Sequence, residues 1–329
     1  MKRPTLSIVV PNYNHGHYLP ACLDSILSQS WQPDELMVID DCSTDNSVEI
    51  IEAYQKRFPQ IRLHRNERNR GCLWNLNWGM EQATGDFIYF PGADDVLLPG
   101  LFEKSMKILS EHPEAGACCG IGDWRESATG WRWFVGVGLA DRPTYFSPDE
   151  LVRLDRSGKL FIATNTVMAR RTSLIEAGRY NGDLKWHADW FIVHVAAFRR
   201  GLCYVPEPLG IFNIHPTSFF KRGRNDPAAH REVLTRILDQ LALPQFADVR
   251  SRVVAGGTLF EFGWPMLRLL LSDRRHRDYL TPVYLRKTLA HITKLVGRKF
   301  TPGWLARWYF RYGGYWVKDA PPVSPASAR

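Results

Sequence analysis

Short apolar runs alternate with longer stretches of helical periodicity along the first 111 residues. The apolar runs are rich in β-branched and aromatic residues, which favours buried strands, and they cover residues 6–10, 36–39, 61–63 and 87–90. Between them, apolar residues recur at helical spacing, and the predicted helices cover residues 18–31, 46–58, 73–82 and 99–111. This alternation predicts an α/β fold: a mostly parallel sheet with helices on both faces.

The C-terminal part of the chain has helical periodicity without intervening strands. We predict helices over residues 232–243, 253–271 and 283–295, with a kink at Pro265 in the second. Residues 304–318 then interleave aromatic with basic side chains, and residues 320–329 are rich in Pro, Ser and Ala, which predicts a disordered tail. We therefore divide the chain into an α/β domain at 1–221, a basic helical segment at 222–319 and a tail at 320–329.

Polar clusters follow three of the predicted strands, at residues 11–14, 40–45 and 94–95. In parallel sheets, ligands bind in the crevice outside the carboxyl ends of the strands, so these clusters are expected to meet at one edge. The chain has no G-x-G-x-x-G after its first strand and no P-loop, which disfavours a dinucleotide fold and a P-loop ATPase. A crevice lined with carboxylates would bind a diphosphate through Mg²⁺ or Mn²⁺, which prefer oxygen ligands.

Positive charge is concentrated at the C-terminal end. The formal net charge is +8, and residues 268–318 alone hold twelve Lys or Arg against two acids. Basic helices followed by aromatic residues suit an anionic membrane surface. A helical appendage packed on the first domain, or a homodimer contact, explains the same pattern. We expect no nucleic-acid partner, because the segment has no recognised motif and the carboxylate crevice would repel a phosphate backbone.

The spacing of the cysteines and the length of the apolar segments indicate a cellular compartment for the protein. Six cysteines form no C-x-x-C pair, so we predict buried, reduced thiols. No segment approaches the roughly 20 apolar residues that span a bilayer. We expect a cytoplasmic protein, with peripheral contact at the inner face of the membrane as an option.

Motifs along residues 5–220 resemble those of family 2 glycosyltransferases, which have the GT-A fold, a Rossmann-like α/β architecture. The ordered set is more specific than any single motif. The matching stretches are residues 7–14 (SIVVPNYN), 25–30 (SILSQS), 38–45 (VIDDCSTD), 69–79 (NRGCLWNLNWG), 84–88 (TGDFI), 90–100 (FPGADDVLLPG), 164–171 (TNTVMARR), 186–190 (WHADW), 206–209 (PEPL) and 215–218 (HPTS).

The resemblance implies roles for particular residues. Pro11 and Tyr13 would cradle the nucleotide base, and Asp41 would accept a hydrogen bond from it. The same motifs place Asn14, Gly71 and Asp94 among the nucleotide-binding positions.

The resemblance also implies a metal and a base. Asp94 and Asp95 correspond to the family's metal-binding motif, and His215 to a histidine that reaches the metal or the diphosphate. Asp189 lies where the family has its general base. The chain departs from the family pattern at Gly92, where an aspartate is common, and at Ala188, where a glutamate is common.

These roles imply an inverting, metal-dependent hexosyltransferase. It would move a sugar from a nucleoside-diphosphate sugar, a UDP sugar in particular, to a hydroxyl of a glycan or lipid-linked acceptor. Polysaccharide or lipopolysaccharide synthesis is the expected setting. A direct attack with Asp189 as base inverts the anomeric carbon and needs no second catalytic carboxylate.

Other interpretations remain open from the residues alone. Asp40, Asp41 and Asp45 suit a turn or a helix cap, and Asp189 suits the N-terminal dipole of a helix. His215 could be structural. The whole chain could be an inactive module that binds sugar nucleotides or glycans. A sugar nucleotidyltransferase is disfavoured because residues 11–14 do not resemble the Gly-rich loop that holds a triphosphate.

Overall fold

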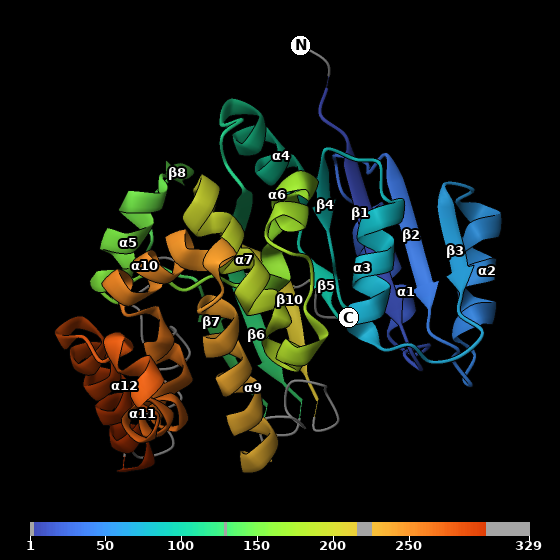
Figure 1. The fold of residues 1–329 in the computed structure, drawn as a ribbon. Helices are drawn as coiled ribbons and strands as arrows, with labels where there is room; N and C mark the ends of the chain where they lie inside the picture. Colours follow the sequence, from blue (N-terminus) through green and yellow to red (C-terminus); the bar gives the residue numbers. More distant parts are fainter. Residues whose placement is uncertain (1–2, 128–129, 216–225, 301–329) are drawn as a thin grey trace.

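The computed structural model describes residues 3–127, 130–215 and 226–300. Four parallel strands form its N-terminal half in the order β3-β2-β1-β4, with helices crossing between them (Figure 1). The elements are β1 (Leu6–Asn12), α1 (Leu19–Leu27), β2 (Glu35–Asp40), α2 (Ser47–Arg57), β3 (Ile61–Arg65), α3 (Cys72–Gln82), β4 (Phe87–Tyr89) and α4 (Leu101–Glu111). The predicted α/β architecture is confirmed, and each predicted strand and helix of this half is present.

Beyond β4 the sheet becomes mixed. Its order continues β9-β6-β10-β5, in which β6 and β10 run parallel and the other neighbouring pairs are antiparallel. Strand β7 pairs with β6, and β8 with β10. These strands are β5 (Val96–Leu97), β6 (Ala117–Glu126), β7 (Trp131–Val135), β8 (Thr144–Phe146), β9 (Met168–Arg170) and β10 (Leu202–Ile214).

Helices cover both faces of the sheet. Successive side chains of β1 point to opposite faces and therefore belong to two different hydrophobic cores. Leu6, Ile8 and Val10 are buried against α1, α2 and α4. Val9 points to the other face, where α3 packs. Gly79 makes this second contact possible, because a Cβ there would lie 2.4 Å from Val9 Cγ1. Because side chains in a strand alternate between the two faces of the sheet, β1 contacts a different layer of helices on each face.

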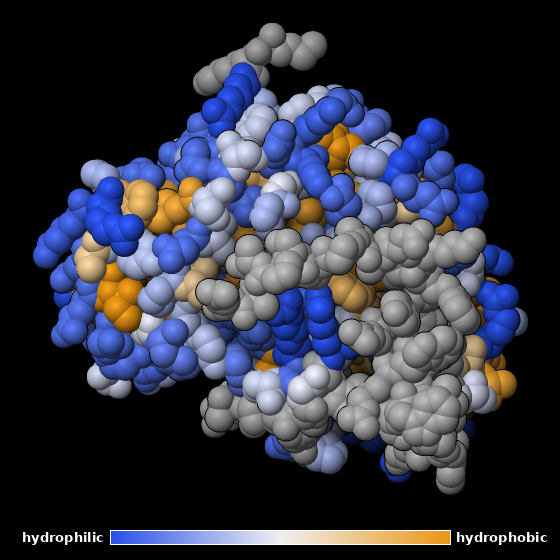
Figure 2. All heavy atoms as spheres, turned by 180° about the vertical axis from the view of Figure 1, so that it is seen from behind, coloured by the Kyte–Doolittle hydropathy of each residue, from blue (hydrophilic) through white to orange (hydrophobic). Residues whose placement is uncertain are grey.

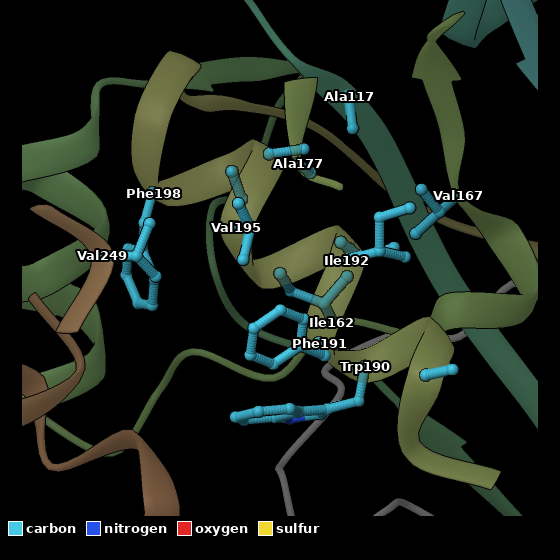
Figure 3. Close-up of a cluster of buried hydrophobic side chains, with 14 of the residues drawn as sticks. Ala117, Ile162, Val167, Ala177, Trp190, Phe191, Ile192, Val195, Phe198 and Val249 are labelled. Atoms are coloured by element: carbon cyan, nitrogen blue, oxygen red, sulfur yellow. The ribbon is translucent and has the colours of Figure 1, made fainter. Parts of the chain in front are cut away.

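The second core continues into the C-terminal helices. It joins α5 (Pro148–Arg156), α6 (Arg171–Glu176) and α7 (Ala188–Arg200) to α9 (Pro227–Leu241), α10 (Ala247–Gly256), α11 (Gly263–Ser272) and α12 (Pro282–Phe300). Figure 3 shows one junction, where Phe198 of α7 lies beside Val249 of α10. In Figure 1 these C-terminal helices lie at the end of the molecule opposite β3 and α2.

The predicted helix over residues 253–271 is wrong in two respects, its continuity and its kink. The chain breaks at Gly257, whose φ is 67°, and continues as the short η4 (Thr258–Phe262) before α11 begins. A Cβ at Gly257 would lie 3.0 Å from the backbone nitrogen of Tyr284, so glycine permits both the turn and the contact with α12. Pro265 causes no kink, because it lies in the first turn of α11, where proline is tolerated.

Two predictions concern residues outside the described ranges: the aromatic and basic stretch at 304–318 and the tail at 320–329. The predicted boundary at 221 also falls outside them. Within the described ranges, no helix has the length and apolar character to cross a bilayer. Where Figure 2 colours the back of the molecule, the surface is largely hydrophilic, with hydrophobic residues in small separate groups.

Candidate active site at the strand ends

The loops after β1 and β2 are tied together by polar side chains. The Asn12 amide donates to Asp40 Oδ1 at 2.8 Å, and the Asn14 side-chain oxygen accepts from the backbone of Thr44 at 2.8 Å. Asn14 has a φ of 55°, a left-handed conformation that asparagine tolerates. Tyr13 therefore projects from a braced loop, and it is 45% exposed. Pro11 lies within β1, next to this loop.

Asp41 is buried, and its carboxylate holds the loop before α3. Its Oδ1 accepts from Asn66 Nδ2 at 2.7 Å and from the backbone of Arg70 at 2.8 Å, while Oδ2 accepts from the backbone of Gly71 at 2.8 Å. Gly71 has a φ of 87°, which favours glycine. Oδ2 keeps one acceptor position beyond the bond from Gly71. The turn interpretation and the nucleotide-binding interpretation of Asp41 are therefore compatible.

Asp94 and Asp95 lie in the loop between β4 and β5. Asp95 is buried and accepts from the backbone of Gly92 at 3.2 Å; burial and the charge of Asp94 raise its pKa well above the usual range. Its Oδ1 is buried with no hydrogen-bond partner in the described part of the chain. The glycine at 92 leaves room for the neighbouring carboxylate, because a Cβ there would lie 2.7 Å from Asp94 Oδ1.

His215 comes from the end of β10 and lies beside Tyr18, which precedes α1. The Tyr18 hydroxyl is 3.1 Å from His215 Nδ1, and Ser127 Oγ is 3.3 Å from the same nitrogen. Burial and the charge of Asp94 raise the pKa of Tyr18, so this group lies near the Asp94 loop. Asn213 strengthens that link by donating to the backbone oxygen of Asp94 at 2.7 Å.

Asp189 occupies the first turn of α7. Its Oδ1 accepts from the backbone of Trp190 at 2.7 Å, and its Oδ2 accepts from the Thr164 hydroxyl at 2.8 Å. Burial raises the pKa of the carboxyl although both hydrogen bonds oppose that change. The helix N-terminus and Thr164 therefore orient a carboxylate that holds a proton more readily than one in water.

Cys72, at the start of α3, shows that these loops converge. Its side chain is solvent-accessible, yet the protein atoms around it raise the pKa of the thiol to about 12, with further contributions from Asp189, Asp41 and Asp94. Three carboxylates from three separate loops thus act on one point.

The prediction that the cysteines are buried is wrong for two of the six. Cys42 and Cys72 are exposed, while Cys22, Cys118, Cys119 and Cys203 are buried, and all six are free thiols. Both exposed cysteines lie on strand-end loops or helix starts at the carboxyl edge of the sheet.

Some residues of this site have no local sequence signal. Tyr18 matches the apolar stripe of a helix, and Thr164 lies 25 positions from its partner Asp189. Arg125 and Arg132 both form ion pairs with the buried Asp123, each at 2.7 Å.

The donor set at Asp94 and Asp95 fits a divalent cation held jointly with a substrate. Two adjacent carboxylates, one with an unpartnered buried oxygen, supply oxygen ligands and repel each other without a cation. Among the described residues, no three His, Cys, Asp or Glu side chains are gathered into a preformed metal site. The remaining positions of an octahedral shell would come from diphosphate oxygens and water.

Comparison with known proteins identifies a family for this chain. The profile of the family described as glycosyl transferase family 2 matches residues 7–178. The uncharacterized glycosyltransferase YibD from Escherichia coli K12 is 29% identical over 250 residues, which cover 72% of this chain and 70% of YibD.

Solved structures share the fold. The fragment 1–349 of S. aureus TarS in complex with UDP-GlcNAc superposes with a TM-score of 0.59 at 17% identity, over 88% of this chain and 92% of that fragment. The mannosyltransferase PcManGT from Pyrobaculum calidifontis, in complex with GDP-Man and Mn²⁺, gives a TM-score of 0.51 at 16% identity, over 88% and 87%.

Proposed function

This chain belongs to glycosyl transferase family 2, and we propose that it is an inverting transferase that moves a sugar from a nucleoside-diphosphate sugar to an acceptor hydroxyl. The observation that carries the proposal is the convergence of Asp41, Asp94 and Asp189 around Cys72. The first two lie on the loops where the family pattern has its donor site, and the third lies in the first turn of α7. The proposed donor is a UDP sugar, in line with the sugar nucleotide bound to TarS.

The proposed donor site uses the loops after β1, β2 and β4. Tyr13 is exposed and free to stack on the base, and Asp41 offers its remaining acceptor position to a base N–H. The backbone of Gly71, at the start of α3, is held in place by the same carboxylate. These contacts would orient the nucleotide so that the diphosphate reaches the Asp94 loop.

Asp94 and Asp95 would hold the metal, with His215 close to it or to the diphosphate. A bound Mg²⁺ or Mn²⁺ would neutralise the negative charge that grows on the leaving diphosphate. The residues themselves support this assignment through the unpartnered Asp95 oxygen and the proximity of Asp94 to Tyr18 and His215. PcManGT binds Mn²⁺ on the same fold.

Asp189 is the proposed general base. It accepts the proton of the acceptor hydroxyl as the hydroxyl oxygen attacks the anomeric carbon and the bond to the diphosphate breaks. Positioned base catalysis of this kind contributes about 10²- to 10⁴-fold. The raised pKa of the buried carboxyl favours proton uptake, and Thr164 fixes its orientation. A single displacement of this kind inverts the anomeric configuration.

We also propose a glycan or lipid-linked acceptor, with peripheral contact between the C-terminal helices and an anionic membrane. Arg153 and Arg156 at the end of α5 and Arg286 of α12 line one depression. Leu285 and Leu289, on the same helix as Arg286, are exposed at 45% and 64%. Cationic side chains beside exposed leucines match the charged headgroups and apolar boundary of such a surface.

Vesicle sedimentation tests the membrane contact. We expect the protein to sediment with phosphatidylglycerol vesicles and not with phosphatidylcholine vesicles. Arg153→Glu combined with Arg286→Glu should abolish sedimentation, while Lys107→Glu on the exposed face of α4 should not. Equal sedimentation of the two charge variants, or none by the wild type, contradicts the proposal; self-association without vesicles would instead indicate a homodimer contact.

Release of nucleoside diphosphate tests the transferase. The protein is incubated with a panel of UDP, GDP and dTDP sugars and alkyl glycoside acceptors, with Mg²⁺, Mn²⁺ or a chelator, and the product is examined by NMR for its anomeric configuration. We expect release with one donor class, loss with the chelator, and an inverted product. No release with any donor, although nucleotides bind, would support a binding module instead.

A further inference from the structure

A buried polar network joins α12 to α5 and to the turn after α10. Lys287 Nζ lies 2.6 Å from Asp155 Oδ1 and donates to the backbone oxygen of Gly256 at 2.9 Å. The Thr258 hydroxyl donates to Asp155 Oδ2 at 2.6 Å. Asp155 and Thr258 are fully buried and Lys287 nearly so. The network fixes η4, the short segment that carries Glu261, against the catalytic half of the chain.

Glu261 extends this network to α7. Its Oε2 accepts from the indole Nε1 of Trp190 at 2.9 Å, while its Oε1 is buried with no partner in the described part of the chain. Burial and the charge of Asp155 raise the pKa of Glu261 to about 8, against the opposing effects of Trp190 and Lys287. At neutral pH the carboxyl is therefore largely protonated, and it still accepts the indole hydrogen bond.

Trp190 is the link to the proposed base. Its indole packs against Phe262, with ring centroids 4.8 Å apart, and against His194 at 4.3 Å. Its backbone N–H donates to Asp189 Oδ1 at 2.7 Å. Among the described residues, Glu261 is the hydrogen-bond partner of the indole N–H, so this bond sets the rotation of the ring within its aromatic surroundings.

We propose that Glu261 is a positioning residue, which holds Trp190 and through it the orientation of the Asp189 carboxylate. The inference rests on the proposed function of Asp189. It assigns part of the catalytic geometry to the C-terminal helical segment, which lies beyond the last of the motifs at residues 5–220. The C-terminal helices thereby act on the site as well as packing beside it.

Charged and titratable side chains surround Glu261 from α5, α7 and α12. Asp155 of α5 and Lys287 of α12 form the ion pair, and Trp190 and His194 come from α7. Burial lowers the pKa of His194 to about 4, so it carries no charge near neutral pH. His291 of α12 lies against Phe260, next to Glu261, with ring centroids 6.1 Å apart.

Steady-state kinetics on two variants test the positioning role. Glu261→Leu removes the acceptor for Trp190, and we expect kcat to fall about tenfold, the effect of one lost buried hydrogen bond, with KM for the donor unchanged. Glu261→Gln keeps an acceptor oxygen, so its kcat should lie within threefold of the wild type. Glu232→Leu, an exposed glutamate on α9, is the matched control. Wild-type kcat in Glu261→Leu, or an equal loss in both Glu261 variants, overturns the proposal.

A second measurement needs no substrate, so its failure is distinguishable from failure of the proposed function. The indole N–H of Trp190 is observed by ¹⁵N NMR and assigned with Trp190→Phe. We expect its resonance to titrate with a midpoint near the pKa of about 8 expected for Glu261 and to become independent of that ionisation in Glu261→Gln. A resonance that titrates identically in both proteins shows that Glu261 does not hold the indole, and overturns the proposal even if the enzyme is active.

Discussion

Replacing Lys287 with methionine tests how firmly the C-terminal helices are held on the catalytic sheet. Methionine matches the length of the lysine stem and removes only the charge and its donors. The Asp155 carboxylate would then be buried with Thr258 as its remaining donor, and the backbone oxygen of Gly256 would lose its partner. Breaking one side of a buried ion pair leaves an uncompensated charge, which costs about 3–5 kcal/mol.

We therefore expect the free energy of unfolding of Lys287→Met to fall by about 3–5 kcal/mol at pH 7. The deficit should shrink at lower pH, because burial already raises the pKa of Asp155 and a protonated carboxyl needs no cation. The double variant Asp155→Leu, Lys287→Met should be more stable than Lys287→Met, since it buries no charge.

Urea unfolding followed by circular dichroism measures these differences. Lys107→Met, which removes an exposed lysine from α4, is the control and should change stability by less than about 0.5 kcal/mol. A loss below about 1 kcal/mol in Lys287→Met would refute the reasoning, because a buried pair cannot lose one partner so cheaply. A double variant less stable than the single one would refute it as well.

Three further predictions follow from single contacts. Asp41→Asn places an amide NH₂ opposite the backbone N–H of Arg70 or Gly71, so one hydrogen bond to a charged acceptor is lost. Nucleotide affinity measured by calorimetry should therefore fall about tenfold; unchanged affinity would contradict this. Gly79→Ala should destabilise the fold by about 1–3 kcal/mol in urea unfolding, through its clash with Val9, whereas Gly182→Ala, in open space, should not; equal effects would count against the packing argument. Cys72 should be alkylated by iodoacetamide far more slowly than Cys42, which is also exposed, at pH 8, as seen by mass spectrometry, because protein atoms and nearby carboxylates raise the pKa of its thiol to about 12; faster reaction at Cys72 would contradict this raised pKa.

The N-terminal half of the fold could be predicted because its signals are local. Each strand there is one apolar run, and each crossover helix has its own periodicity. The pairing of β9, β6, β10 and β5 could not be predicted in the same way, because it joins segments far apart in sequence: β10 pairs with β5 through Gly210 and Leu97. The break at Gly257 was missed because it depends on the approach of Tyr284, which no local pattern records.

The residues of the candidate site also differ in whether a local sequence pattern predicts them. Asp41, Asp94 and Asp189 stand out because strand-end loops and motif order mark them. Cys72 does not, because only the folded chain shows that it lies among the three carboxylates. Glu261 lies 71 positions from Trp190, and its contact depends on the packing of η4 against α7. Local patterns identify the groups with proposed chemical roles, whereas the residues that contact and orient them depend on tertiary packing.

Asp189→Asn tests the central claim most directly. The variant retains the shape of the side chain and one acceptor oxygen for Thr164 or Trp190, but it cannot take up a proton. With the donor that the wild type uses, we predict that acceptor-dependent release of nucleoside diphosphate falls at least about 100-fold, while the affinity for that nucleotide stays within twofold. Release within threefold of the wild type would contradict the assignment of Asp189 as the general base.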